Sequence, residues 1–196
     1  MIRGGSNPSS DSTRVWCAMS RSSDTIHTRL NSLRATQVEP CWSFFKDVTM
    51  LRFFIAGVMQ GSSDGEEVVE QCYRTTIREA LSRVFPEADI YDPWAGHEES
   101  ISYSDERGKR VFLEHNAMCG QVDVLIAFLP EASMGTAIEM WEAYRNGKKV
   151  ISISRMRHNW AIKFISDHRY DSLEDFIQEV QDGAFQKRLD VLSHAG

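Results

Sequence analysis

From residue 51 onward, apolar runs of strand length alternate with segments whose apolar residues recur every three or four positions. The strongest run, VDVLIAFL at 122–129, is apolar at consecutive positions rather than at alternate ones. Consecutive apolar residues are typical of strands buried on both faces, as in a parallel sheet. Parallel neighbours need a crossover helix between them, so this order predicts a three-layer α/β fold. We expect a flavodoxin-like or Rossmann-like parallel sheet of about five strands with helices on both faces.

The same periodicities predict the approximate bounds of each element. Strands are expected at 51–56, 88–91, 122–129 and 149–153, and helices at 66–84, 106–119, 136–145, 159–166 and 172–182. The helix at 172–182 is expected to be the last element of the chain. On the helix at 106–119, Val111, Ala117 and Met118 are expected to face the core.

The first 49 residues differ in composition from the rest of the chain. They contain nine Ser and five Thr, show no sustained apolar period, and carry a net charge of +2 against −8 for the remainder. We expect 1–49 to be a disordered or adventitious leader, with Met50 as the functional start. The predicted domain then spans 50–185, and 186–196 is expected to be a C-terminal tail.

Composition excludes several classes of function. The formal net charge is −6 and Lys and Arg do not cluster, so long nucleic acid is not an expected partner. No apolar run approaches the ~20 residues of a membrane helix, and no membrane association is expected. The four cysteines form no C-x-x-C pair, which argues against a zinc or disulfide framework. Reduced thiols in a cytoplasmic protein fit better, and no metal site is expected.

The first strand is followed by the glycine-rich loop GVMQGSSDG at 57–65. Glycines let the backbone approach a ligand closely, and the free N–H groups of such a loop hold anions. The loop lacks the Lys of a P-loop and the spacing of a G-x-G-x-x-G fingerprint. No ATP, dinucleotide or other cofactor is therefore expected, and a plain turn between strand and helix explains the loop equally well.

The second candidate site follows the strand at 122–129. Ser133, Gly135 and Thr136 lie where a helix should begin, a place that favours anions. Glu139 follows Thr136 by three positions, so it is either a capping-box glutamate or a carboxylate nucleophile at the strand ends. His115, on the preceding helix, is either a structural histidine or a catalytic one.

Four segments resemble the nucleoside 2-deoxyribosyltransferase superfamily, which includes nucleoside 5′-monophosphate N-glycosidases. They read FFIAGVMQGS at 53–62, VDVLIAFL at 122–129, SMGTAIEMWEA at 133–143 and GKKVISI at 147–153. The most specific part is D-x-x-x-A from Asp123, then S-x-G-x-x-x-E from Ser133 to Glu139, and an Ala four residues later. The resemblance covers 51–180.

This resemblance implies a set of roles. Glu139 takes the place of the family's nucleophile, which attacks the anomeric carbon of the sugar, and Ser133 that of its phosphate-contacting serine. Gly57, Gly61 and Ser62 would line the sugar-phosphate side, with Gly135 at the helix start. Base and partner-subunit contacts are implied for Asp92, Trp94 and Asn159, and a homodimer or higher homo-oligomer is expected.

One position departs from the family pattern. The family usually has an Asp eight residues before the strand Asp, where this chain has His115. A histidine titrates near neutral pH and serves as a general acid in many enzymes. Either His115 takes over the role of the Asp, or the chemistry at the base differs, or catalysis is lost.

The leading prediction is hydrolysis of the N-glycosidic bond of a (deoxy)nucleoside 5′-monophosphate to free base and sugar phosphate. Base exchange by a deoxyribosyltransferase is the closest alternative. A phosphoribohydrolase of the lysine-decarboxylase-like type fits less well, because 130–136 lacks the double Gly of that group. A non-catalytic nucleotide sensor and a flavoprotein of similar sheet order stay open.

Overall fold

The computed structural model describes residues 50–59 and 70–194, which all belong to one compact unit, Lys46–Gly196. The predicted leader, like Gly61 and Ser62, lies outside the described residues. The strands are β1 (Arg52–Gly57), β2 (Asp89–Tyr91), β3 (Val124–Phe128), β4 (Lys149–Ile153) and β5 (His168–Tyr170). The helices are α1 (Cys72–Val84), α2 (Asp105–Cys119), α3 (Met134–Arg145), α4 (Trp160–Ile165), α5 (Leu173–Gln181) and α6 (Ala184–His194), with a 3₁₀ turn at Ser100–Ser102.

The strands form one parallel sheet in the order β2-β1-β3-β4-β5, which confirms the predicted flavodoxin-like architecture. Gly57 pairs with Phe128 and Phe128 with Ile153, so the carboxyl ends of β1, β3 and β4 lie level. Ligands bind at this edge of open α/β sheets because the loops there diverge.

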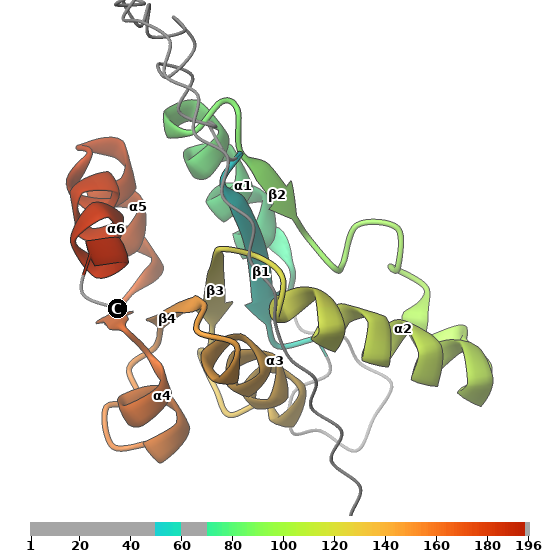
Figure 1. The fold of residues 1–196 in the computed structure, drawn as a ribbon. Helices are drawn as coiled ribbons and strands as arrows, with labels where there is room; N and C mark the ends of the chain where they lie inside the picture. The colour runs from blue at the N-terminus through green and yellow to red at the C-terminus, as the bar shows by residue number, and fades with distance from the viewer. Residues whose placement is uncertain (1–49, 60–69, 195–196) are drawn as a thin grey trace, which may run out of the picture. The chain divides into compact units, whose positions relative to one another are not determined.

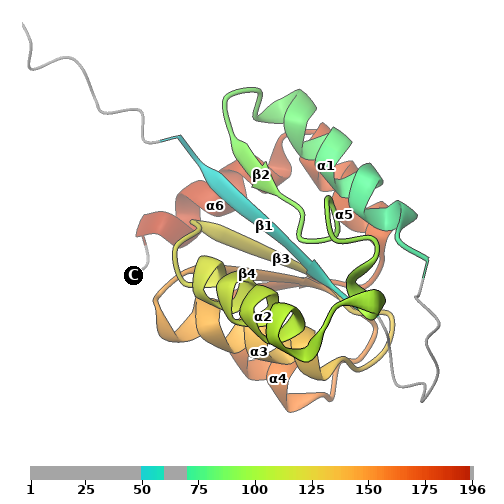
Figure 2. The ribbon, with the colours of Figure 1, turned by 90° about the vertical axis from the view of Figure 1, so that its right-hand side faces the viewer.

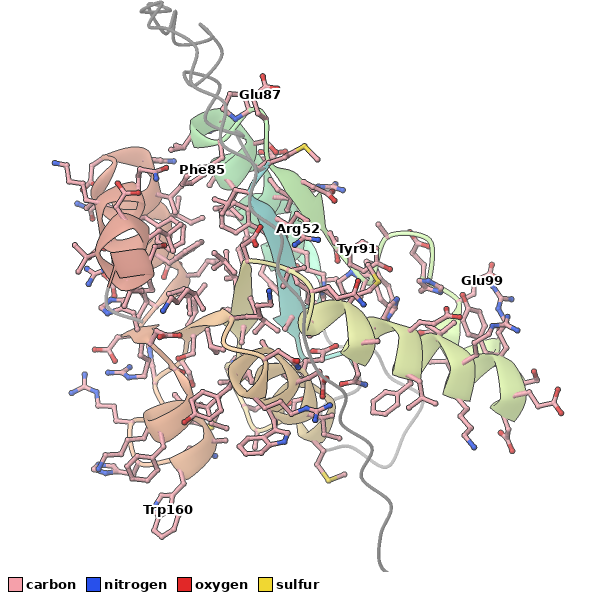
Figure 3. All side chains as sticks on the ribbon, viewed as in Figure 1. Arg52, Phe85, Glu87, Tyr91, Glu99 and Trp160 are labelled. Atoms are coloured by element: carbon pink, nitrogen blue, oxygen red, sulfur yellow. The ribbon has the colours of Figure 1, made fainter. Side chains whose placement is uncertain are left out.

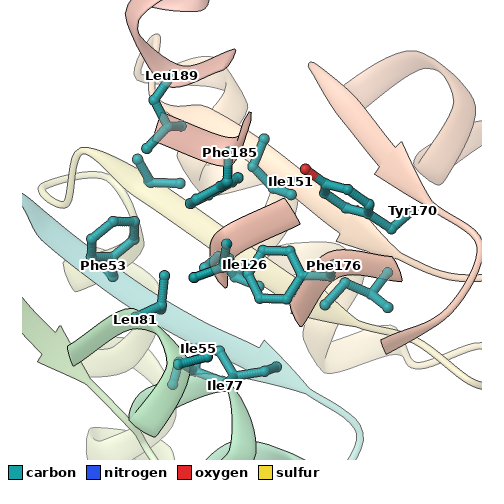
Figure 4. Packing of buried hydrophobic residues seen from close by; sticks show 14 of the residues in the cluster. Phe53, Ile55, Ile77, Leu81, Ile126, Ile151, Tyr170, Phe176, Phe185 and Leu189 are labelled. Atoms are coloured by element: carbon teal, nitrogen blue, oxygen red, sulfur yellow. The ribbon is translucent and has the colours of Figure 1, made fainter. Parts of the chain in front are cut away.

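Helices cover both faces of the sheet (Figures 1 and 2), and each face has its own core. One face, which we term the α1 face, packs Phe53, Ile55 and Ile126 against α1, α5 and α6 (Figure 4). The opposite face, the α3 face, packs Phe54 and Leu125 against α2, α3 and α4. The alternation of β1 side chains between the two cores explains why its sequence is apolar throughout.

Helix ends follow the expected capping chemistry. Ser133 begins α3, and its side-chain oxygen accepts a hydrogen bond from Thr136 N at 3.3 Å. Asn159 caps α4 in the same way, accepting from Ala161 N at 3.0 Å. Such caps stabilise a helix by about 1 kcal/mol, so both residues have a structural role in addition to any role in a site.

The C-terminal end of the chain differs from the prediction. The stretch 186–196, predicted to be a tail, instead lies largely in α6, and the helix at 172–182 is not the last element. Phe185 and Leu189 of α6 are buried in the core of the α1 face. The spacing of four places both on one side of a helix, which is the signal that the sequence reading missed.

Two further differences concern β5 and the helix faces. β5 was not predicted, because HRY is short and polar. On α2 the buried residues are His115, Asn116 and Cys119. Met118 packs against the core of the α3 face as predicted, whereas Ala117 is exposed and its predicted inward position was wrong. Among the described residues α1 begins at Cys72, after Glu70 and Gln71 in non-helical conformation.

Candidate functional site

A cavity of about 990 Å³ opens at the carboxyl edge of the sheet. Its walls come from the end of β1, from the segment between β2 and α2, from α2 itself, from the first half of α3 and from the start of α4. Of the predicted site residues, it brings together Gly57, His115, Ser133, Gly135, Glu139 and Asn159. Asp92 and Trp94 are not among the lining residues.

The Glu139 carboxylate is largely shielded from solvent. The residue is only 8% exposed, and none of the described residues donates a hydrogen bond to it. Burial raises its pKa from 4.5 to about 8, and the nearby positive charge of Arg74 lowers it in part. The helix cap is Ser133 rather than Thr136, so Glu139 lies beyond the first turn and is not a capping-box residue.

Ser133 combines its capping role with access to the cavity. Its oxygen accepts hydrogen bonds from Thr136 N at 3.3 Å and from Thr136 Oγ1 at 3.1 Å. A hydroxyl has two acceptor positions and one donor, so the O–H donor is left for a ligand. Together with the N-terminal N–H groups of α3, this donor favours an anionic group at this end of the cavity.

His115 lies buried against three aromatic rings. Its Nε2 is 3.0 Å from Tyr91 Oη, and its ring meets the His97 ring edge-on at 5.0 Å between centroids. Burial, and secondarily the charge of His97, lower the pKa of His115 to about 4. At neutral pH the ring is therefore uncharged. Its ring nitrogens are available as hydrogen-bonding groups, and the catalytic role predicted for His115 stays a prediction.

His97, which the sequence analysis did not assign to any site, belongs to the cavity lining. Its Nδ1 lies 2.9 Å from Tyr103 Oη, and the Tyr103 ring packs under the guanidinium of Arg107. The imidazoles of His97 and His115 and the phenol of Tyr103 thus line one side of the cavity as hydrogen-bonding groups, without a carboxylate among them. This composition suits a flat heteroaromatic group with both donors and acceptors.

Arg74 is a buried charged residue beside the cavity that the sequence did not predict. Its side chain is 1% exposed, and its guanidinium donates to Ile55 O at 2.7 Å, Gly57 O at 3.2 Å and Gln71 Oε1 at 2.6 Å. It also forms an ion pair with Asp92 at 3.1 Å. These contacts tie the end of β1 to the segment after β2, directly behind the cavity lining.

Asp92 and Trp94 lie outside the cavity lining and contact other protein groups. One carboxylate oxygen of Asp92 accepts hydrogen bonds from Arg74 Nη1 and from Trp94 N, at 3.1 and 3.0 Å. Asp92 is buried, so the geometry gives it a partner inside the protein rather than a position facing a ligand. The substrate contacts predicted for both residues stay predictions.

Gly57 is the one lining residue whose lack of a side chain has a direct cause. A Cβ atom at this position would clash with the phenol of Tyr73. The same ring packs on Phe128 at 4.4 Å between centroids, so it cannot move aside easily. Glycine at the end of β1 therefore lets α1 approach the cavity.

No protein-family model and no curated protein sequence matches the chain. A 2-deoxyribosyltransferase from the psychrotolerant bacterium Bacillus psychrosaccharolyticus has a similar structure, with a TM-score of 0.50 at 17% identity, over 64% of this chain and 90% of that one. The chain has a 2-deoxyribosyltransferase-like fold. A conserved protein from Enterococcus faecalis V583 covers 98% of its own length and 68% of this chain, at 17% identity and a TM-score of 0.46. The Vibrio vulnificus NanR protein complexed with ManNAc-6P has a TM-score of 0.42 at 10% identity, over 74% of this chain and 54% of that one.

Two observations bound the chemistry of this 2-deoxyribosyltransferase-like fold. Within 50–59 and 70–194, no three His, Cys, Asp or Glu side chains gather as metal ligands do. No helix in this part of the chain combines the length and the apolar character needed to cross a membrane. The polar side chains that line the cavity include the Glu139 carboxylate, hydroxyls and imidazoles.

Sequence reasoning missed Arg74 and left the role of His97 open. Arg74 lies three residues before Ile77 and seven before Leu81, on the buried side of α1. A charged residue on the apolar face of a predicted helix is the signal that could have found it. For His97 no local pattern distinguishes a lining residue from a loop histidine.

Proposed function

We propose that this chain hydrolyses the N-glycosidic bond of a (deoxy)nucleoside 5′-monophosphate, with Glu139 as nucleophile. The observation that supports this best is the buried Glu139 carboxylate, with no hydrogen-bond donor among the described residues, in the same cavity as the start of α3. A carboxylate without hydrogen-bond donors keeps its lone pairs for an electrophile.

The proposed reaction has two steps. A Glu139 oxygen attacks C1′ of the sugar, and the new C1′–O bond forms as the C1′–N bond breaks and its electron pair leaves with the base. Water then attacks C1′ of the glycosyl-enzyme and releases sugar phosphate, which regenerates the carboxylate, while the proton that the water loses goes to the departed base. The phosphate is assigned to the Ser133 hydroxyl and the N–H groups at the start of α3.

The base is assigned to the side of the cavity that holds His115. Where Tyr91 donates its hydroxyl proton to Nε2, the neutral ring carries its own proton on Nδ1. That N–H then donates to a nitrogen or oxygen of the departing base. Such a hydrogen bond stabilises the negative charge that develops as the glycosidic bond breaks.

The test is a panel of ribo- and deoxyribonucleoside 5′-monophosphates and free nucleosides, with free base and sugar phosphate measured by chromatography. Release of one base by the wild-type protein, abolished in Glu139→Gln, supports the proposal. Release that persists in Glu139→Gln contradicts it. If nucleotides bind but are not cleaved, the protein is a nucleotide-binding module instead.

Base exchange is the second candidate, because the similar solved structure with a TM-score of 0.50 is that of a 2-deoxyribosyltransferase. Both reactions share the glycosyl-enzyme and differ in whether water or a second base attacks it. Adding a second free base to the assay separates them. Formation of a new nucleoside or nucleotide at the expense of free sugar phosphate would favour transfer.

We also propose that the protein acts in the cytoplasm as a homodimer built on α3 and α4. Met134, Ile138 and Trp141 expose their side chains at helical spacing along α3, and Trp160, 78% exposed, projects from α4 (Figure 3). Exposed Trp and Met are typical of interface cores. Met134 and Ile138 also line the cavity, so a second copy on this surface would close its rim.

Light scattering after size exclusion tests the dimer. Trp141→Glu places a charge in the proposed interface and should give a folded monomer. Val191→Glu is the matched control, because Val191 is exposed on α6 at the other face of the sheet. A wild-type protein that stays monomeric at micromolar concentration would contradict the proposal.

A further inference from the structure

Three formal charges are buried in the described part of the chain, and all three lie at the carboxyl edge of the sheet. They are Arg74, Asp92 and Glu139, and every other Lys, Arg, Asp and Glu in 50–59 and 70–194 reaches solvent to a greater extent. Burying a charged side chain costs folding free energy unless the charge is paired with an opposite one. Arg74 and Asp92 pair directly, whereas Glu139 has no such partner among the described residues.

The guanidinium of Arg74 is held in a single orientation. Its Nε bonds Gln71, its Nη1 is shared between Ile55 O and Asp92, and its Nη2 bonds Gly57 O. Arg74 starts from α1 on the α1 face of the sheet, and it reaches the backbone of Gly57, a residue of the cavity lining. Its charge is therefore fixed just behind the cavity.

Three titratable groups near Glu139, the side chains of Tyr73, Cys119 and His115, carry no charge at neutral pH. Burial is the main cause that raises the pKa of Tyr73 to about 12 and the pKa of Cys119 well above its ordinary value, and the Glu139 charge adds to both. His115, with its pKa lowered to about 4, is neutral as well. Arg74 is the charged group whose field acts on Glu139.

We propose that Arg74 is a positioning residue for the proposed reaction, holding the end of β1 beneath the cavity and supplying the positive charge that lets Glu139 exist as a carboxylate nucleophile. Asp92 is the counter-charge that limits this effect. The inference rests on the proposed role of Glu139. It predicts opposite consequences for removing the two partners of one ion pair, which a merely structural ion pair would not produce.

The test follows the titration of Glu139 in two ways. The first is the pH dependence of kcat/KM for base release with the best substrate of the nucleotide panel. The second is the carboxyl ¹³C chemical shift of Glu139 against pH, assigned by its loss in Glu139→Gln, which needs no substrate. The second readout separates failure of this inference from failure of the proposed function.

In Arg74→Gln we expect the Glu139 midpoint to rise by about one pH unit or more, which is about a tenfold loss of kcat/KM below the midpoint. In Asp92→Asn, which still accepts from Trp94 N, we expect a smaller shift downward. Arg74→Lys keeps the charge and should restore most of the wild-type midpoint. If Arg74→Gln does not fold, Arg74→Lys and Asp92→Asn still carry the comparison.

Arg145→Gln is the matched control, because Arg145 lies on the same helix as Glu139 but pairs with Glu142 at the surface. Its midpoint should equal that of the wild type. The inference is overturned if Arg74→Gln or, where that variant does not fold, Asp92→Asn titrates like Arg145→Gln. It is also overturned if loss of either partner moves the midpoint in the same direction.

Discussion

Replacing Glu139 by Gln should stabilise the protein while it destroys the proposed activity. Burial raises the pKa of the folded-state carboxyl from 4.5 to about 8, so the folded protein binds this proton more tightly than the unfolded chain does. The stabilising contribution is complete below pH 4.5 and is lost as the pH rises toward 8. Since one pH unit corresponds to about 1.4 kcal/mol, the wild type should lose about 3 kcal/mol relative to Glu139→Gln between pH 5 and pH 8.

Urea unfolding of both proteins at several pH values between 5 and 8 measures this difference directly. In thermal unfolding, about 3 kcal/mol corresponds to a gap in Tm that widens by about 6–12 °C for a domain of this size. The amide of Gln makes its own contacts, but these add a constant that does not vary with pH. A difference in unfolding free energy that stays flat from pH 5 to pH 8 would refute the reasoning, because it would mean that Glu139 ionises as it does in water.

Three further predictions concern residues of the same cavity. The kcat/KM for base release should rise with pH to a midpoint near 8, because Glu139 must lose its proton to attack; a pH-rate profile checks this. Ser133→Ala should lower kcat/KM for a 5′-monophosphate about tenfold more than for the free nucleoside. Ser104→Ala, the control, removes the helix cap of α2 outside the cavity and should lower only the unfolding free energy, by about 1 kcal/mol. Gly57→Ala should destabilise by about 1–3 kcal/mol through its clash with Tyr73, whereas Gly108→Ala, with open space around its Cβ, should stabilise by about 1 kcal/mol; urea unfolding distinguishes the two signs.

The parts of the fold that the sequence predicted well are those where burial leaves little choice. β1, β3 and β4 are buried on both faces, so their apolar runs are stable only as central strands of a sheet. The predicted bounds of β4 match the observed ones at both ends. β5 was missed because an edge strand of three residues needs only one buried side chain, Tyr170. α6 was missed because an apolar spacing of four near a chain end is a weak pattern until the uncovered sheet face is known.

The candidate-site residues that lie close together in the sequence were predictable. Those that come from the helix layer on the other face of the sheet were not. Ser133, Gly135 and Glu139 fall within seven consecutive residues after β3, so their spacing alone places them in the first half of one helix. Arg74 is 65 residues away from Glu139 in sequence and belongs to the helix layer on the other face. The assignment of Asp92 to the substrate came from the resemblance to the nucleoside 2-deoxyribosyltransferase superfamily. Its ion pair with Arg74 depends on a residue whose burial the sequence did not indicate.

This crossing of layers explains why the pH behaviour of the site cannot be assigned to α3 alone. Glu139 is dehydrated by the core of the α3 face, while the charge that opposes this dehydration comes from α1 on the other face. Gly57 is the position where α1 comes close to the cavity lining, because a side chain there would collide with Tyr73, the neighbour of Arg74 on α1. A change that moves α1, even without touching the cavity lining, should therefore alter the ionisation of Glu139. The reactivity of the carboxylate is in this sense a property of the packing of α1 against β1.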